Sequence, residues 1–246
     1  MKKHLILLIT TLVCAFSYAQ SSVEAIQTDT PPKPQTEVNE KPPKFRVSAQ
    51  AGFGYRTAAI QPDWPAPIKR HAKQLKTNLS FGADVSYFFY KNIGIGVKYN
   101  GISGSANSRD LPFVLDDGST IDVSLSEKIG IHYIGGFLGI RHFTKENKLC
   151  FFANAGGGYV RFVDNGVSQG IRAIITGNTG AFLGEIGFDY FATKRLAIGL
   201  QVSFTAGVLK NITTTVGKVS VKEALDKADH ENISHIDISL GFRFYK

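Results

Sequence analysis

After the first 44 residues, hydrophobic and polar residues alternate with a period of two. In 195–209, for example, Leu196 and Val202 fall on one face, whereas Gln201 and Ser203 fall on the other. This period is typical of a β-strand and not of a helix. The pattern predicts eight strands, at 46–56, 76–89, 93–103, 128–142, 148–161, 178–190, 195–209 and 233–245.

The predicted strands are long, at 11 to 15 residues each. Strands of soluble proteins usually have about 5 or 6 residues, whereas a tilted strand that crosses a membrane needs about 9 to 11. The connections alternate between short ones (90–92, 144–147 and 191–194) and long ones (57–75, 104–127, 162–177 and 210–232). This layout predicts an all-β fold over 45–246, an eight-stranded antiparallel up-and-down transmembrane β-barrel with both ends on the short-turn side.

Two of the strands have a blurred pattern. In 128–142 the hydrophobic residues change phase, so we predict a β-bulge at 133–136. In 148–161 three consecutive glycines remove the side chains that would mark a face. In the last long connection, 221–228 is either a short helix or an extension of the strands.

The face opposite the hydrophobic residues carries mostly Gly, Ser, Asn and Gln, with isolated charges of both signs. A soluble barrel of the lipocalin kind also alternates, but its polar face would be solvated and rich in Lys, Glu and Thr. The observed composition favours a crowded polar lumen, in which glycines make room for long side chains.

An eight-stranded barrel is only wide enough for side chains to fill it. Buried charges need partners, so we predict a polar network in the lumen. Its members are Arg46, Arg56, Asp84, Lys98, Arg141, Glu185, Asp189, Arg195, Asp237 and Arg243. The network either locks the barrel or lines a narrow, gated polar path.

The N-terminal residues 1–19 have the features of a signal peptide, namely two lysines, a short apolar run and small residues before a cleavage site after Ala19. A lipoprotein would use Cys14, but Val13 before it is not small. Cleavage leaves Cys150 alone, without a disulfide partner. The Pro-rich residues 20–44 are predicted to be a disordered periplasmic tail, or a tether for another envelope protein.

The formal net charge of +8 is spread along the chain without a nucleic-acid-binding motif. We therefore expect no nucleic-acid partner, and anionic lipid headgroups explain the sign. In the first long connection, a basic cluster is expected either to contact lipopolysaccharide phosphates or to be a solvated loop. Its members are Lys69, Arg70, Lys73 and Lys76.

Histidines are the candidate bases for an enzyme on such a barrel, which would also need a serine and an acid near the outer rim. Those after the signal peptide are His71, His132, His142, His230 and His235. None lies in a recognisable catalytic or metal-ligand spacing. The sequence therefore predicts no enzymatic activity, no metal site and no cofactor.

With its signal peptide, eight alternating strands and a final strand ending Ile236 to Phe244, the chain resembles the outer-membrane β-barrel superfamily. That superfamily includes the OmpA transmembrane domain and porin-like single-domain proteins of Bacteroidota-type bacteria. Unlike the family, the chain closes on Tyr245-Lys246 and not on a terminal aromatic residue. The resemblance implies a location in the cell outer membrane, among outer-membrane lipid and lipopolysaccharide. It also implies that the barrel-assembly machinery recognises the final strand.

Three functions remain open. The first is a non-enzymatic barrel with a filled lumen, in a structural or surface-interaction role through its long extracellular loops. The second is a narrow small-solute channel or a secretion-system accessory barrel, and the third is a lipid-modifying enzyme.

Overall fold

A computed structural model describes residues 42–114, 119–144 and 147–246. The predicted signal peptide and most of the predicted tail lie outside the described residues. The strands are β1 (Phe45–Arg56), β2 (Thr77–Phe88), β3 (Ile93–Val114), β4 (Thr120–Phe143), β5 (Leu149–Ser168), β6 (Ile171–Phe191), β7 (Leu196–Leu209), β8 (Asn211–Val216), β9 (Val219–Ala224), β10 (Glu231–Asn232) and β11 (His235–Tyr245). One helix, α2, covers Ala66–Gln74.

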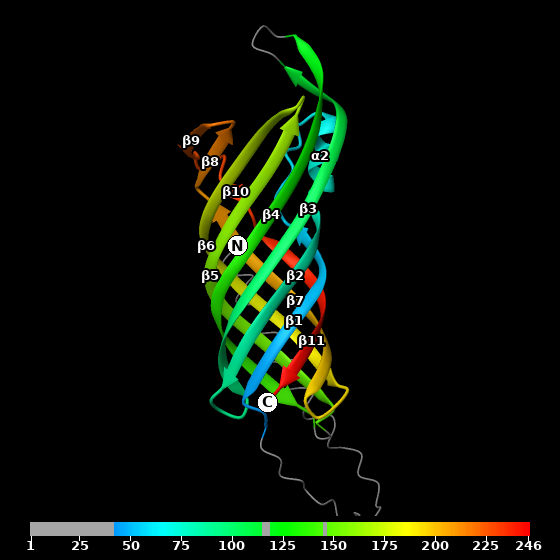
Figure 1. Ribbon diagram of the computed structural model, residues 1–246, viewed down its shortest axis with the longest axis vertical. Helices are drawn as coiled ribbons and strands as arrows, with labels where there is room; N and C mark the ends of the chain where they lie inside the picture. Colours follow the sequence, from blue (N-terminus) through cyan, green and yellow to red (C-terminus); the bar gives the residue numbers. More distant parts are fainter. Residues whose placement is uncertain (1–41, 115–118, 145–146) are drawn as a thin grey trace, which may run out of the picture. The chain divides into compact units, whose positions relative to one another are not determined.

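Eight of these strands form a closed antiparallel ring in the order β1-β2-β3-β4-β5-β6-β7-β11 (Figure 1). The ring closes where β1 pairs with β11, from Arg46 opposite Tyr245 to Arg56 opposite His235. Closure leaves no strand of the ring with an unpaired edge. In lipid this is required, because backbone N–H and C=O groups there have no water with which to form hydrogen bonds. The predicted eight-stranded up-and-down barrel is confirmed.

One end of the barrel, here called the turn end, carries the short connections between β2 and β3, β4 and β5, and β6 and β7 (Figure 1). Both ends of the barrel sequence meet there, because the Phe45 N–H donates to the Lys246 carbonyl at 2.7 Å. The opposite end is called the loop end.

At the loop end, two of the predicted long connections are wrong. In place of loops at 104–127 and 162–177, β3 and β4 continue as a paired extension and so do β5 and β6. Gln169 and Gly170 have positive φ angles of 49° and 80°, which suit the two-residue turn of the second hairpin. These extensions lack an apolar outer face, so the alternation that reveals a membrane strand is missing from their sequence.

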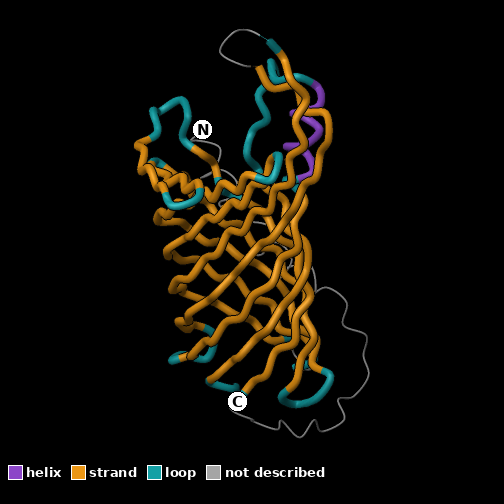
Figure 2. The backbone as a smooth tube through the Cα atoms, turned by 45° about the horizontal axis from the view of Figure 1, so that its top comes forward, coloured by secondary structure: helices purple, strands orange, loops and turns teal. Residues whose placement is uncertain are grey.

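The other two connections also contain regular structure (Figure 2). Helix α2 lies within 57–75, and Pro65 at its start fits a position that needs no N–H donor. In 210–232, β8 and β9 form a hairpin, so the extended alternative for 221–228 holds as far as Ala224. Among the described residues, no helix has the length and apolarity needed to cross a membrane.

The bulge predicted at 133–136 is absent, because β4 keeps one register with β3 and β5 through this segment. The register shift lies instead between Ser108 and Leu111, opposite the start of β4. Ile129, Ile131 and Tyr133 therefore point into the barrel with their apolar side chains. The change of phase in the sequence marks an apolar patch in the lumen and not a kink.

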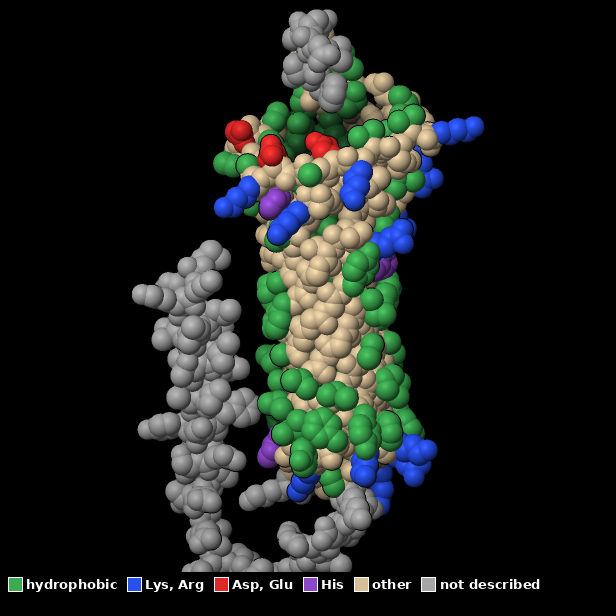
Figure 3. Space-filling view, turned by 90° about the vertical axis from the view of Figure 1, so that its left-hand side faces the viewer, with side chains coloured by type: hydrophobic (Ala, Val, Ile, Leu, Met, Phe, Trp, Pro, Cys, Tyr) green, Lys and Arg blue, Asp and Glu red, His purple; other side chains and the backbone are tan. Residues whose placement is uncertain are grey.

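The outer face of the ring is apolar. Large side chains exposed there include Phe53, Leu79, Leu138, Phe182 and Phe242, with relative exposures of 53 to 66%. So extensive an apolar surface is not expected to face water. Figure 3 shows it on the side of the barrel, here called the apolar wall, with Lys and Arg side chains above and below it. The apolar face points outward and the polar face inward, which contradicts the lipocalin-type alternative.

Candidate functional site: the filled lumen and the loop end

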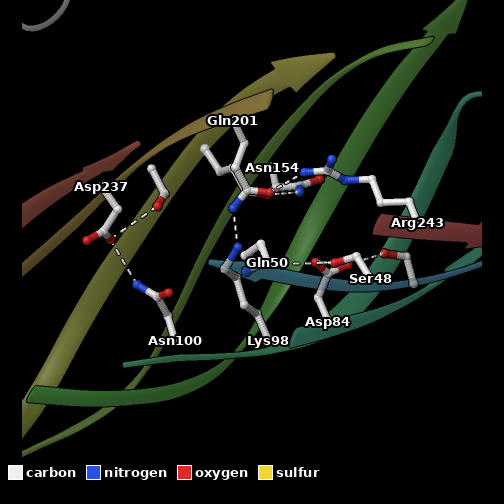
Figure 4. Close-up of polar contacts among 12 residues, drawn as sticks. Ser48, Gln50, Asp84, Lys98, Asn100, Asn154, Gln201, Asp237 and Arg243 are labelled. Carbon is white, nitrogen blue, oxygen red and sulfur yellow. Dashed lines mark hydrogen bonds and ion pairs between the residues drawn. The ribbon is translucent and has the colours of Figure 1, made fainter. Parts of the chain in front are cut away.

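The lumen near the turn end is filled by ionised side chains on facing strands (Figure 4). Lys98 on β3 and Glu185 on β6 form an ion pair in which both side chains have 0% exposure. Glu185 also accepts hydrogen bonds from Asn154 (2.8 Å) and Gln201 (3.0 Å). These three donors satisfy a carboxylate that would otherwise be costly to bury.

The same chain of contacts continues to the turn end. Arg243 donates to the Oε1 atom of Gln201, and its Nη1 atom lies 3.0 Å from Oδ1 of Asp189. The hydroxyl group of Tyr245 donates to the other oxygen of Asp189. The network thus links β3 across the lumen to β6, β7 and β11, with which β3 forms no direct strand pairing.

A second ion pair lies beside this chain. Arg46 Nη2 is 2.9 Å from Oδ1 of Asp84, and the Ser48 hydroxyl group donates to Oδ2. The guanidinium groups of Arg46 and Arg243 lie 4.6 and 5.1 Å from the ring centroid of Phe152. The aromatic ring stabilises two neighbouring cations whose side chains are buried.

Three more residues of the predicted network are also buried, but with other partners. Asp237 accepts from Asn100 at 2.9 Å and from Ser203 at 3.3 Å. Arg141 donates to backbone carbonyl groups at the turn end, including that of Lys91 at 3.1 Å. Arg56 pairs with Glu231 at 2.7 Å, near the loop end.

The tenth predicted member, Arg195, does not join the network. It is exposed in the turn before β7, which begins one residue later at Leu196. The Thr193 hydroxyl group accepts hydrogen bonds from the backbone N–H groups of Arg195 (3.3 Å) and Leu196 (3.0 Å). The alternation of β7 does not extend back into this turn. The prediction extended it by one residue and therefore placed Arg195 on the lumen face, which is wrong.

Above the ion pairs, towards the loop end, the lumen is apolar, which the sequence pattern did not predict. Its core cluster is Leu75, Ile102, Ala106, Ile129, Ile131, Tyr133, Val160, Phe162, Leu183, Leu209 and Ile233. These residues come from seven segments, and most share the inward face with polar residues lower in the same strands. Only the register of the paired strands shows that these residues lie at the same height along the barrel.

Helix α2 is docked on the loop end through His71, which is only 5% exposed. Its Nδ1 atom lies 2.9 Å from the Ser108 hydroxyl group, and its Nε2 atom lies 2.9 Å from Oε2 of Glu127. Asp164 hydrogen bonds to Glu127. Burial lowers the pKa of His71, and burial beside the Glu127 carboxylate raises the pKa of Asp164 to about 7. The sequence separates these four residues too widely for a motif.

The basic cluster expected at the loop end lies on and just after α2. Lys69 donates to the Pro62 carbonyl at 2.5 Å, and the Lys76 ammonium lies 5.4 Å from the ring centroid of Tyr55. Arg70 and Lys73 are exposed. The four cations therefore differ in their surroundings and do not form one pocket. In the described part of the chain, no group of three or more His, Cys, Asp or Glu could hold a metal ion.

Solved structures similar to this chain are outer-membrane β-barrels. The outer membrane protein OprG from Pseudomonas aeruginosa is 13% identical, with 83% of this chain and 98% of that chain covered and a TM-score of 0.53. A major outer membrane protein from Thermus thermophilus is 11% identical, with 82% and 98% covered and a TM-score of 0.54. No family model and no curated protein matches the chain. Membership of a Bacteroidota-type group stays a prediction, whereas the fold of the chain is that of the outer-membrane β-barrel proteins.

Proposed function

We propose that this protein is a closed outer-membrane barrel that anchors an interaction surface on the outside of the cell. The observation that carries the proposal is the double filling of the lumen, with a buried ion-pair network below and an apolar cluster above. An apolar layer disfavours water and ions. The parts left to bind partners lie at the loop end. They are the β3–β4 and β5–β6 extensions, α2 and the β8–β9 hairpin, and together they form the proposed interaction surface.

Conductance tests the closed lumen. The full chain in a planar bilayer is expected to give no steady current, while a porin in the same bilayer gives one. Replacing Phe162 and Leu183 by Ala thins the apolar layer and should produce leak currents, whereas Phe182→Ala on the outer face should not. Steady, ion-selective currents through the wild-type protein would contradict the proposal and favour the narrow-channel alternative.

Crosslinking in intact cells tests the interaction surface. A photoreactive amino acid at exposed Asn107, in the β3 extension, should form adducts with an envelope component. The same probe at exposed Lys91, in a turn, is the matched control. Adducts from Lys91 alone would contradict the proposal and favour an accessory role on the periplasmic side.

One observation favours a second candidate, a hydrolase. Ser108, His71 and Glu127 have the residue types and spacing of a nucleophile, a base and an orienting acid. A fluorophosphonate probe, which labels activated serines, should then modify Ser108 in the wild-type chain and not in His71→Gln. If Ser108 is not labelled, the hydrolase proposal is wrong, and the only role of the three residues is to hold α2 on the loop end.

A further inference from the structure

A polar pocket of about 270 Å³ opens on the outer wall of the barrel, near the loop end. It lies where β6 changes partner, from β7 at Ala181 to β8 at Gly177. The side chains that line it include Tyr159, Arg161, Asn178, Asn211, Thr213 and Lys222. This pocket is called the lateral pocket below.

The lateral pocket lies at the upper edge of the apolar wall. Outward-facing Tyr159 is 48% exposed and pairs with Gly180, while Arg161 pairs with Asn178 one step closer to the loop end. Below this level the outer face carries Phe182, and above it the strands carry Thr176 and Thr213. An aromatic residue followed by a cation is the arrangement found at headgroup depth, and Figure 3 shows Lys and Arg side chains gathered at this edge.

The charge of the lateral pocket is unbalanced. Arg161 and Lys222 line it, and no Asp or Glu does. Within the described residues neither cation forms an ion pair. Amide and hydroxyl groups of Asn178, Asn211 and Thr213 add neutral hydrogen-bonding partners. Two unpaired cations with such partners fit a phosphate group, since phosphate oxygens accept charge-assisted hydrogen bonds.

Three glycines leave a strip of bare backbone on the outer wall next to the lateral pocket, between the side chains of Tyr159 and Phe182. Gly136, Gly157 and Gly180 point outward on three neighbouring strands, and the nearest atoms to a Cβ built on them are 3.6 to 3.9 Å away. A shallow smooth surface therefore runs down from the lateral pocket into the membrane region, where an acyl chain can lie flat against the backbone.

We propose that the lateral pocket binds the phosphorylated headgroup of an outer-leaflet lipid, with Arg161 and Lys222 on the phosphate and an acyl chain against the glycine surface. The site lies on the outward side of the β5–β6 and β8–β9 hairpins, where they leave the barrel wall, and it is separate from the cations of α2.

Native mass spectrometry of the full chain in detergent tests this site, with lipid A as the probe. Wild type should bind lipid A at least tenfold more tightly than its dephosphorylated form. The double variant Arg161→Gln/Lys222→Gln should lose at least tenfold. The matched control Arg70→Gln/Lys73→Gln removes the same charges from α2 and should change binding less than twofold. A heat-dependent gel shift verifies that each variant is folded.

Three outcomes would overturn the proposal. Equal binding of the dephosphorylated lipid would remove the role of the phosphate. Equal losses in both double variants would mean a diffuse attraction without a site. Full displacement of lipid A by millimolar inorganic phosphate would mean an anion site in which the lipid chain has no part.

Discussion

Arg243 on β11 and Asp189 on β6 form a buried ion pair across β7, with Nη1 3.0 Å from Oδ1. The pair lies directly over Gly199 of β7, where a Cβ would overlap both of these atoms. Two charged side chains therefore occupy the space that a third side chain would need. The glycine is part of the ion-pair site although it carries no functional group.

Gly199→Ala should destabilise the barrel by about 2 kcal/mol or more, because the added methyl group separates a buried ion pair. Urea unfolding from lipid vesicles measures the loss. Gly136→Ala is the matched control, since its Cβ would meet nothing closer than 3.8 Å. That variant should stay within about 0.5 kcal/mol of wild type, and equal losses would show that any glycine replacement in a strand is harmful.

Lys98→Met should lower the free energy of unfolding by about 3 to 5 kcal/mol, because Glu185 would keep a buried charge without its cation. Adding Glu185→Gln removes that charge and should restore part of the loss. The double-mutant cycle then gives the coupling energy of the pair. Additive losses would mean that Asn154 and Gln201 satisfy the carboxylate without Lys98.

His71→Ala should release α2 from the loop end without opening the barrel. The variant loses both contacts of the imidazole, to Ser108 and to Glu127. Trypsin should then cleave after Lys73 several times faster than in wild type, while the heat-dependent gel shift of the barrel stays the same. Gln74→Ala, an exposed change on the same helix, should leave the cleavage rate unaltered.

The raised pKa of Asp164 predicts a pH-dependent stability at the loop end. Its folded pKa of about 7 exceeds the ordinary value of 3.8, so the folded chain holds a proton that the unfolded chain releases. This contribution is present at pH below 3.8 and is lost as pH rises to about 7. The lowered pKa of His71 makes stability rise with pH, which opposes the effect of Asp164. The contribution of Asp164 is therefore measured by comparing an Asp164 variant with wild type.

Asp164→Asn should therefore raise the melting temperature at pH 8 and leave it nearly unchanged at pH 4. Thermal unfolding in detergent at both pH values measures the difference. Asp122→Asn, at an exposed position of β4, is the control and should show no such dependence. An equal effect of Asp164→Asn at the two pH values would contradict the assignment.

The barrel strands were predictable where lipid touches one face and packed side chains touch the other. Ile236 to Phe244 alternate strictly for this reason, and the structure places β11 within one or two residues of the prediction. The extension of β3 beyond Ser103 was not predictable, because lipid does not contact it and its sequence carries no such pattern.

The inward position of Lys98, Glu185, Asp189 and Arg243 followed from the period of two along each strand. Their partners did not, because Lys98 and Glu185 are 87 residues apart and register across several strands decides which level each side chain reaches.

The sequence alone thus determined the class of fold and the face of most residues, since both depend on local alternation. Tertiary structure alone decided that the upper lumen is apolar, that His71 meets Ser108 and Glu127, and that Arg161 and Lys222 line one pocket. Each of these depends on closure of the barrel and on strand register, which bring together residues from distant segments.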